Sequence, residues 1–225
     1  MLPGIAPLAL STGYILAGLI TCEPQPAPEL TFNLQNTPPQ IDNTQSSRDL
    51  AGLKGNSTSP RYGSEFPIVG GLTASDFKAE FTMNFSKSFA KEGNDACLWI
   101  KDAVVTITYT PVVYVASNYR PGSCRYNLTE EHEMMHVGVD TITLKEFMPY
   151  IEQVANSGVA QAYSVGPIDR EEIDAEQNRL AKKLSTVLQE AIAQLQQARR
   201  MRQQQVDSRV EYRRLSTSCL DEPAH

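Results

Sequence analysis

The chain has little histidine and little clustered positive charge. Only three of its 225 residues are histidines, and an excess of Asp and Glu gives a net charge of −6 and an isoelectric point near 5.2. Because no Lys/Arg-rich block occurs before the last helical stretch, the sequence does not favour nucleic acid as a partner. The cysteines include no CxxC pair, which argues against a zinc site built from Cys and His. A hydrophobic content of 41% suffices for a moderate packed core.

Charged residues are also absent from residues 1–21, which are rich in Leu, Ile, Ala and Gly. This stretch resembles the apolar region of a secretory signal without its basic start, and it is barely long enough to cross a bilayer. We therefore predict that residues 1–22 are a signal peptide or a membrane anchor, and that the protein is exported to the periplasm or the extracellular space. Cys22 follows Leu-Ile-Thr, which resembles a lipoprotein cleavage box, so lipidation of Cys22 is the alternative to simple cleavage nearby.

Aromatic residues are nearly absent from residues 23–60, where Phe32 is the exception. Pro, Gln, Asn, Ser and Thr dominate instead, which predicts a disordered linker. Such a linker would hold a folded domain away from a membrane if the N-terminus is an anchor. We place that folded domain at residues 61–221.

Strand patterns come first in the predicted domain. Residues 80–85 and 103–109 alternate polar and apolar side chains, as half-buried strands do. Pro111 interrupts the pattern before residues 112–116, which favours a free edge in the last strand before the next helix. Two ordinary hairpin strands are the alternative.

Two of the three histidines lie in residues 132–136, which read HEMMH, within a predicted helix from residue 127 to about residue 155. Histidines four residues apart share one helical face, so His132 and His136 can reach one zinc ion. Glu133 can then act as a general base towards water that the metal activates. This HExxH pattern is typical of zinc peptidases, in which a substrate backbone pairs with an edge strand. The alternative is an exposed helix that happens to carry two histidines.

A catalytic zinc needs a third protein ligand, and no other internal histidine is available. Asp140 is our first candidate because it follows His136 by four residues on the same face, although it lies about 12 Å from His132 along a straight helix. Glu172 is the second candidate, since gluzincins take their third ligand from a later helix. Glu171 and Glu176 lie beside it. Asp140 can instead accept a hydrogen bond from a ligand imidazole.

Tyr114 and Tyr119 precede the HExxH helix. A tyrosine hydroxyl near the metal can donate a hydrogen bond to the oxyanion that forms when water attacks a peptide carbonyl. Tyr114 is therefore predicted as a catalytic residue beside Glu133, and packing is the alternative for both tyrosines.

Cysteines of exported proteins tend to pair. A Cys97–Cys124 disulfide would join the start of the helix to the sheet, and we predict this pairing. Cys219 could replace either partner, because sequence alone does not determine connectivity.

A second helix is predicted from residue 169 to residue 201 or beyond, with one apolar stripe. Residues 194–214 are rich in Gln and Arg and are interpreted as solvated or partner-facing. A long amphipathic helix packed on the first is the simpler expectation, and self-association through this helix is the alternative.

Several segments resemble the bacterial family of predicted secreted zinc-dependent proteases. They are residues 97–99 (CLW), 109–116 (YTPVVYVA), 122–126 (GSCRY), 132–136 (HEMMH) and 211–214 (EYRR). The resemblance implies an exported metallopeptidase-like domain. The chain differs from metzincins, because Val139 and Ile142 stand where those enzymes have Gly and His.

The sequence thus predicts an α+β fold in which a small antiparallel sheet packs on the HExxH helix and a second long helix, behind a disordered tether. The predicted function is that of an exported zinc-dependent peptidase-like hydrolase acting on a peptide or protein substrate. The alternative function is that of a non-catalytic cell-envelope protein that acts through its long helix as an interaction or structural module.

Overall fold

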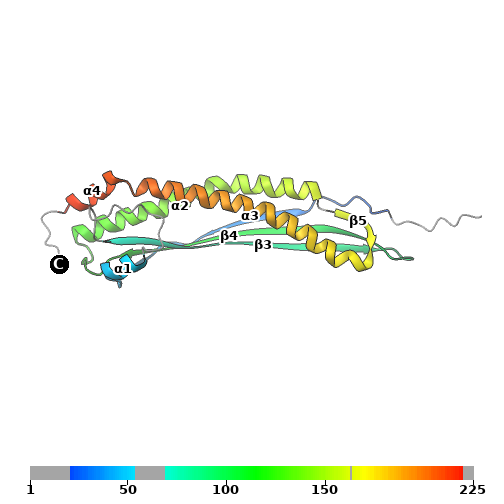
Figure 1. Cartoon of the computed structure of the whole chain (residues 1–225), viewed down its shortest axis with the longest axis horizontal. Coiled ribbons are helices and arrows are strands. Elements are labelled where there is room, and N and C mark those ends of the chain that lie inside the picture. The colour runs from blue at the N-terminus through cyan, green and yellow to red at the C-terminus, as the bar shows by residue number, and fades with distance from the viewer. Residues whose placement is uncertain (1–20, 54–68, 163, 220–225) are drawn as a thin grey trace, which may run out of the picture.

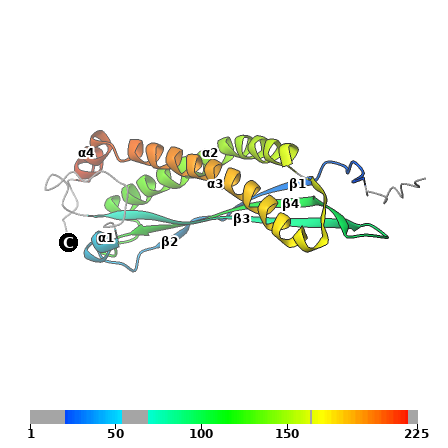
Figure 2. The same ribbon diagram turned by 45° about the vertical axis from the view of Figure 1, so that its right-hand side comes forward.

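The computed structural model describes residues 21–53, 69–162 and 164–219. These residues form an elongated body in which two long helices lie along one face of a sheet (Figures 1 and 2). In chain order the elements are β1 (Glu29–Asn36), β2 (Gln40–Asp42), α1 (Ser47–Leu53), β3 (Gly71–Phe89), β4 (Asp95–Val115), α2 (Cys124–Ala162), β5 (Ser164–Asp169), the 3-10 turn η3 (Arg170–Glu172), α3 (Ile173–Val206) and α4 (Arg209–Thr217). The mixed α and β class is as predicted.

Most of the predicted signal or anchor, residues 1–20, lies outside the described residues. Within the described part of the chain, no helix combines the length and the apolar character needed to cross a membrane.

β4 is the central strand of the sheet. The sequence predicted an antiparallel sheet, but the sheet is mixed. β3 pairs antiparallel with β4 along one side. On the other side β1 and β2 run parallel to β4, and β5 pairs antiparallel with its first residues. The antiparallel prediction considered only the β3–β4 hairpin. Two strands from the N-terminal segment, β1 and β2, also join the sheet, and both run parallel to β4.

The stretch predicted as a disordered linker therefore contributes to the fold, and that prediction is wrong for β1, β2 and α1. In β1, Leu30, Phe32 and Leu34 alternate with exposed polar residues and pack against the core. Leu50 in α1 is completely buried. Period-two alternation within a polar composition is the signal that the composition obscured.

The last strand before the HExxH helix does not have the free edge that was predicted. β4 is flanked on both sides, and Pro111 lies between the end of its pairing with β1 at Tyr109 and the start of its pairing with β2 at Val112. The residue without an N–H thus coincides with a break in pairing on that side. Within the described residues β3 pairs with β4 alone, so the unpaired edge belongs to β3.

The two long helices pack against each other as well as on the sheet. α2 continues past Gly158, where a Cβ atom would lie 3.2 Å from Leu184 Cδ1, so glycine permits close approach of α3. The apolar stripe of α3 is buried in the protein's own core and includes Leu180, Leu184, Leu188 and Leu195.

Two disulfides connect distant parts of the chain, Cys22 to Cys97 and Cys124 to Cys219. The predicted Cys97–Cys124 bond is wrong because most of β4, roughly 60 Å at about 3.3 Å per residue, separates the two cysteines. The Cys124–Cys219 alternative is the one observed. Cys22 uses its sulfur in a disulfide, which contradicts the predicted lipidation at that atom. Two disulfides indicate an oxidising, exported environment.

Candidate metal centre

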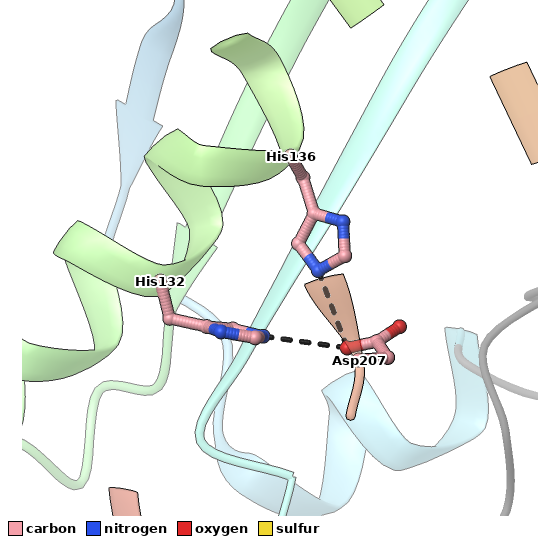
Figure 3. A group of neighbouring side chains, drawn as sticks. All are labelled: His132, His136 and Asp207. Carbon is pink, nitrogen blue, oxygen red and sulfur yellow. Dashed lines mark ion pairs between the residues drawn. The ribbon is translucent and has the colours of Figure 1, made fainter. Parts of the chain in front are cut away.

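His132 and His136 lie on one face of α2, as their spacing requires, with ring centroids 4.9 Å apart. Both side chains are buried. The Nε2 atoms of the two rings point to the same position, where a carboxylate from the other end of the chain meets them (Figure 3).

That carboxylate is Asp207, which lies directly after α3 and is 2% exposed. Its Oδ1 atom is 3.4 Å from His132 Nε2 and 3.3 Å from His136 Nε2. The three residues therefore offer two nitrogens and one oxygen from a buried position, and such a group could hold a metal ion.

Further side chains determine how the two imidazoles are oriented. Glu211 Oε1 is 3.3 Å from His132 Nδ1, and a carboxylate can only accept, so His132 Nδ1 is the donor. Gln203 Nε2 donates to the His136 carbonyl at 3.0 Å, which leaves Gln203 Oε1 to accept from His136 Nδ1. With both Nδ1 atoms protonated, both Nε2 atoms are the ones available to a metal.

Glu133 lies beside this group, and the element that positions it is the start of β3. Thr73 Oγ1 is 2.8 Å from Glu133 Oε2 and 2.9 Å from the Glu133 carbonyl, and it can donate to either. At Gly71 a Cβ atom would lie 2.7 Å from Glu133 Oε1, so only glycine leaves room for the carboxylate there. Burial raises the pKa of Glu133, against the opposing charges of the two histidines.

His136 is strongly basic when no metal competes for its Nε2 atom. Burial by itself would lower its pKa, but the hydrogen bond to Asp207 and the charge of Glu133 outweigh burial and raise the pKa to about 9. The site thus favours a cation at this position, whether a proton or a metal ion.

Neither candidate for the third ligand occupies that position. Asp140 is buried but binds Arg199, whose Nε lies 3.0 Å from Asp140 Oδ1 and whose Nη2 contacts Asp140 Oδ2 at 2.5 Å. Along a continuous helix Asp140 is too far from His132, and the guanidinium engages it instead. Glu172 lies at the beginning of α3 and Asp207 at its end, about 50 Å apart at 1.5 Å per residue.

Three tyrosines lie near the site, in different positions. Tyr114 lines the cleft with Glu133 and His136. Tyr119 packs beside Gly70, the residue before β3, with its Cε2 atom 2.9 Å from where a Cβ of Gly70 would be. Tyr212, which sequence reasoning missed, donates to Asp207 Oδ1 at 3.1 Å and lies edge-on to the His132 ring.

An open cleft of about 720 Å³ runs past the metal-ligand group. One wall is residues 71–77 of β3, whose edge is unpaired within the described residues, and the other is the C-terminal part of α3 with Gln196, Arg200 and Gln203. Glu133, His136 and Asp207 all reach the cleft. A molecule in the cleft would therefore contact the candidate base and the candidate metal ligands together.

The sequence did not predict Asp207 and Glu211 as site residues. Both lie in the Gln/Arg-rich stretch, residues 194–214, that was interpreted as solvated or partner-facing. A local signal was present. Ser208 and Glu211 form the S-x-x-E pattern of a helix start, and Ser208 accepts from the Glu211 N–H as an N-cap. This pattern ends α3 and places Asp207 at the break between two helices.

Comparison with protein-family models, with curated proteins and with solved structures finds no match to this chain.

Proposed function

We propose that this protein is an exported zinc-dependent peptidase, as the resemblance to secreted zinc-dependent proteases implies. The observation that carries the proposal is the convergence of His132 Nε2, His136 Nε2 and Asp207 Oδ1 beside Glu133 in an open cleft. Two imidazoles and one carboxylate, with the cleft on one side, are a typical donor set of a catalytic zinc.

The distances between these donors support zinc as the metal. Ligand atoms about 2.0–2.1 Å from a tetrahedral zinc lie about 3.3–3.4 Å apart. The nitrogen–oxygen distances from Asp207 Oδ1 to the two Nε2 atoms are 3.4 and 3.3 Å. The Nδ1 contacts of both rings add the outer support that metal-binding histidines usually have.

In the proposed mechanism, His132, His136 and Asp207 would hold the zinc. When bound, zinc acts as a Lewis acid that polarises a carbonyl and lowers the pKa of water. Glu133 takes the proton from the attacking water and passes it to the nitrogen of the leaving amine. Its raised pKa, which burial causes, suits a group that must hold this proton.

The substrate lies along β3, whose edge has no partner strand among the described residues and supplies backbone N–H and C=O groups from residues 71–77. Tyr114 lines the same cleft and is the predicted donor to the developing oxyanion. The substrate is thus an extended peptide segment. The protein works in the periplasm or outside the cell, and residues 1–20 determine whether it is tethered to a membrane.

The test combines metal analysis with a peptidase assay on a denatured protein and on quenched fluorescent peptides. We expect about one zinc per chain, and we expect Glu133→Gln to retain zinc while peptidase activity falls at least about 100-fold. Glu130→Gln, on the same helix but without a contact to the metal-ligand group, is the matched control.

Absence of stoichiometric zinc, or unchanged activity in Glu133→Gln, would end the proposal. A zinc-loaded wild type that cleaves none of these substrates would leave a protein that keeps its metal for stability alone.

A further inference from the structure

Three groups at the candidate metal centre come from the short C-terminal segment that follows α3. Asp207 precedes α4, and Glu211 and Tyr212 lie within it. Glu211 orients the His132 ring, and Tyr212 donates to the Asp207 carboxylate. The position of α4 therefore affects two ligands. It affects His132 through the contact with Glu211, and it affects Asp207 through the hydrogen bond from Tyr212.

Apolar burial contributes little to holding α4 in place. None of its residues is buried, and Val210 is 78% exposed. Arg214 lies 3.5 Å from Glu131 of α2, but exposed ion pairs of this kind typically stabilise by only about 0–1 kcal/mol. The contacts of α4 with the rest of the protein include the polar contacts to the site, from Glu211 to His132 and from Tyr212 to Asp207.

A covalent bond holds the far end of α4. Cys219, which is buried, follows α4 and is bonded to Cys124, the first residue of α2. Cys124 lies about two helical turns before His132 on the same helix. The segment from Asp207 to Cys219 is therefore attached at one end to α3 and at the other end to the helix that carries both histidines.

We propose that the Cys124–Cys219 disulfide positions the metal centre. By holding α4 against α2 it keeps Glu211 on His132 and Tyr212 on Asp207, so the site reaches its full zinc affinity only after the disulfide has formed. Cys124 and Cys219 act through Glu211 and Tyr212, so they are positioning residues. The inference rests on the proposed zinc site and adds a condition for its completion.

This coupling links metal binding to export. In a reducing compartment the two thiols leave α4 attached only through α3, and the chain binds zinc weakly. In an oxidising compartment the thiols lose two protons and two electrons to a disulfide oxidant, which is released as a dithiol, and a sulfur–sulfur bond forms. A zinc-dependent activity would then begin only after the protein has left the reducing compartment.

The second disulfide offers a matched control. Cys22–Cys97 ties the N-terminal segment to the start of β4, at the opposite end of that strand from the start of α2. Both disulfides cross-link long stretches of chain, with sequence separations of 75 and 95 residues, so their general effects on the unfolded chain are similar. Only Cys124–Cys219 is connected to the metal centre.

The experiment measures zinc affinity of the full chain by competition with a chromophoric chelator. Cys124→Ser/Cys219→Ser should lower the affinity about 10–100-fold. Cys22→Ser/Cys97→Ser should change it less than about threefold, with circular dichroism confirming that both variants are folded. Equal affinities in both double variants and in the wild type would overturn the inference while leaving the proposed zinc site intact. A wild type that binds no zinc would overturn both.

A third variant separates positioning from general loss of stability. Glu211→Gln should lower zinc affinity about tenfold in the wild-type background and have little further effect once Cys124 and Cys219 are serines. The same loss in both backgrounds would show that the disulfide does not act through Glu211, against the proposal.

If the Cys124→Ser/Cys219→Ser variant does not fold, a reduction experiment answers the same question. The Cys22→Ser/Cys97→Ser variant keeps only the Cys124–Cys219 disulfide, and this variant is loaded with zinc and then reduced. We expect zinc release to follow the appearance of the Cys124 and Cys219 thiols. Retention of zinc after complete reduction would contradict the proposal.

Discussion

Asp207 Oδ1 lies 3.3 Å from His136 Nε2, although one residue follows the end of α3 and the other lies near the beginning of α2. The contact exists because α3 packs against α2 over a long distance and ends beside the HExxH turn. The length of α3 therefore places the carboxylate, and the break after Val206 aims it at the imidazoles.

Replacing Asp207 should remove the metal. Asp207→Ala deletes the only carboxylate within reach of both Nε2 atoms in the described residues, so we expect less than about a tenth of the wild-type zinc affinity. Chelator competition measures this. Glu172→Ala, at the other end of α3, is the control and should bind zinc as the wild type does. Full zinc affinity in Asp207→Ala would show that the third ligand is another residue.

Replacing Asp140 should affect stability rather than metal binding. The Asp140→Asn side chain has the same shape but leaves the buried guanidinium of Arg199 without its counter-charge, which typically costs roughly 3–5 kcal/mol of unfolding free energy. Urea denaturation of the zinc-free protein measures the loss, and zinc analysis of the folded variant should still give about one ion per chain. A folded Asp140→Asn variant that binds no zinc would indicate that Asp140 is a zinc ligand after all.

The parts of the site that the sequence predicts are those fixed by local geometry. His132, Glu133 and His136 follow from helical periodicity alone, because one turn of helix aligns the two rings whatever surrounds it. Asp207 could not be ranked above Asp140, since that choice depends on where α3 ends and on Arg199 pairing with Asp140. The end of α3 and the Arg199–Asp140 pair both depend on tertiary structure.

The fold shows the same division. The alternation in β4 predicts a half-buried strand, and its buried residues face the helices as expected. The parallel addition of β1 was not predicted, because the alternation of Leu30, Phe32 and Leu34 is short and surrounded by residues typical of linkers. The disulfide pairing was wrong for a related reason: Cys97 lies near the start of β4, whereas Cys124 begins the helix that follows the other end of that long strand.

Adding one methyl group at Gly71 should separate metal binding from catalysis. In Gly71→Ala the new Cβ would lie 2.5 Å from Thr129 Cγ2 and 2.7 Å from Glu133 Oε1, so the carboxylate must move. Because Glu133 is not a ligand in the proposed site, zinc content should be unchanged while kcat falls about 10- to 100-fold. Activity and metal assays on one preparation test this. Gly138→Ala is the control, since no atom lies within 4 Å of its Cβ, and it should keep its activity.

The loss of stability with rising pH that His136 causes should disappear when zinc is added. In the metal-free protein the pKa of His136 is raised from 6.5 to about 9, so its contribution to the unfolding free energy is fully present below about pH 6.5 and is lost as the pH rises through about 9. The loss is at most about 3 kcal/mol, at 1.36 kcal/mol per pH unit. The raised pKa of Glu133 acts in the same direction from its ordinary value of 4.5 upwards. Zinc needs the neutral ring, so zinc affinity should rise over the same range. Because the ring carries no proton above about pH 6.5 either in the unfolded chain or in the zinc-loaded protein, this gain offsets the loss, and the stability of the loaded protein should change little with pH there.

Chemical denaturation with chelator and with saturating zinc, at several pH values between about 6 and 9, measures both slopes. Asp207→Asn removes the charge that helps to raise the His136 pKa, so this variant without metal should lose less stability over that range. A metal-free protein whose stability rises with pH between these values would mean that His136 is neutral in the folded state, and that the cluster does not attract a cation.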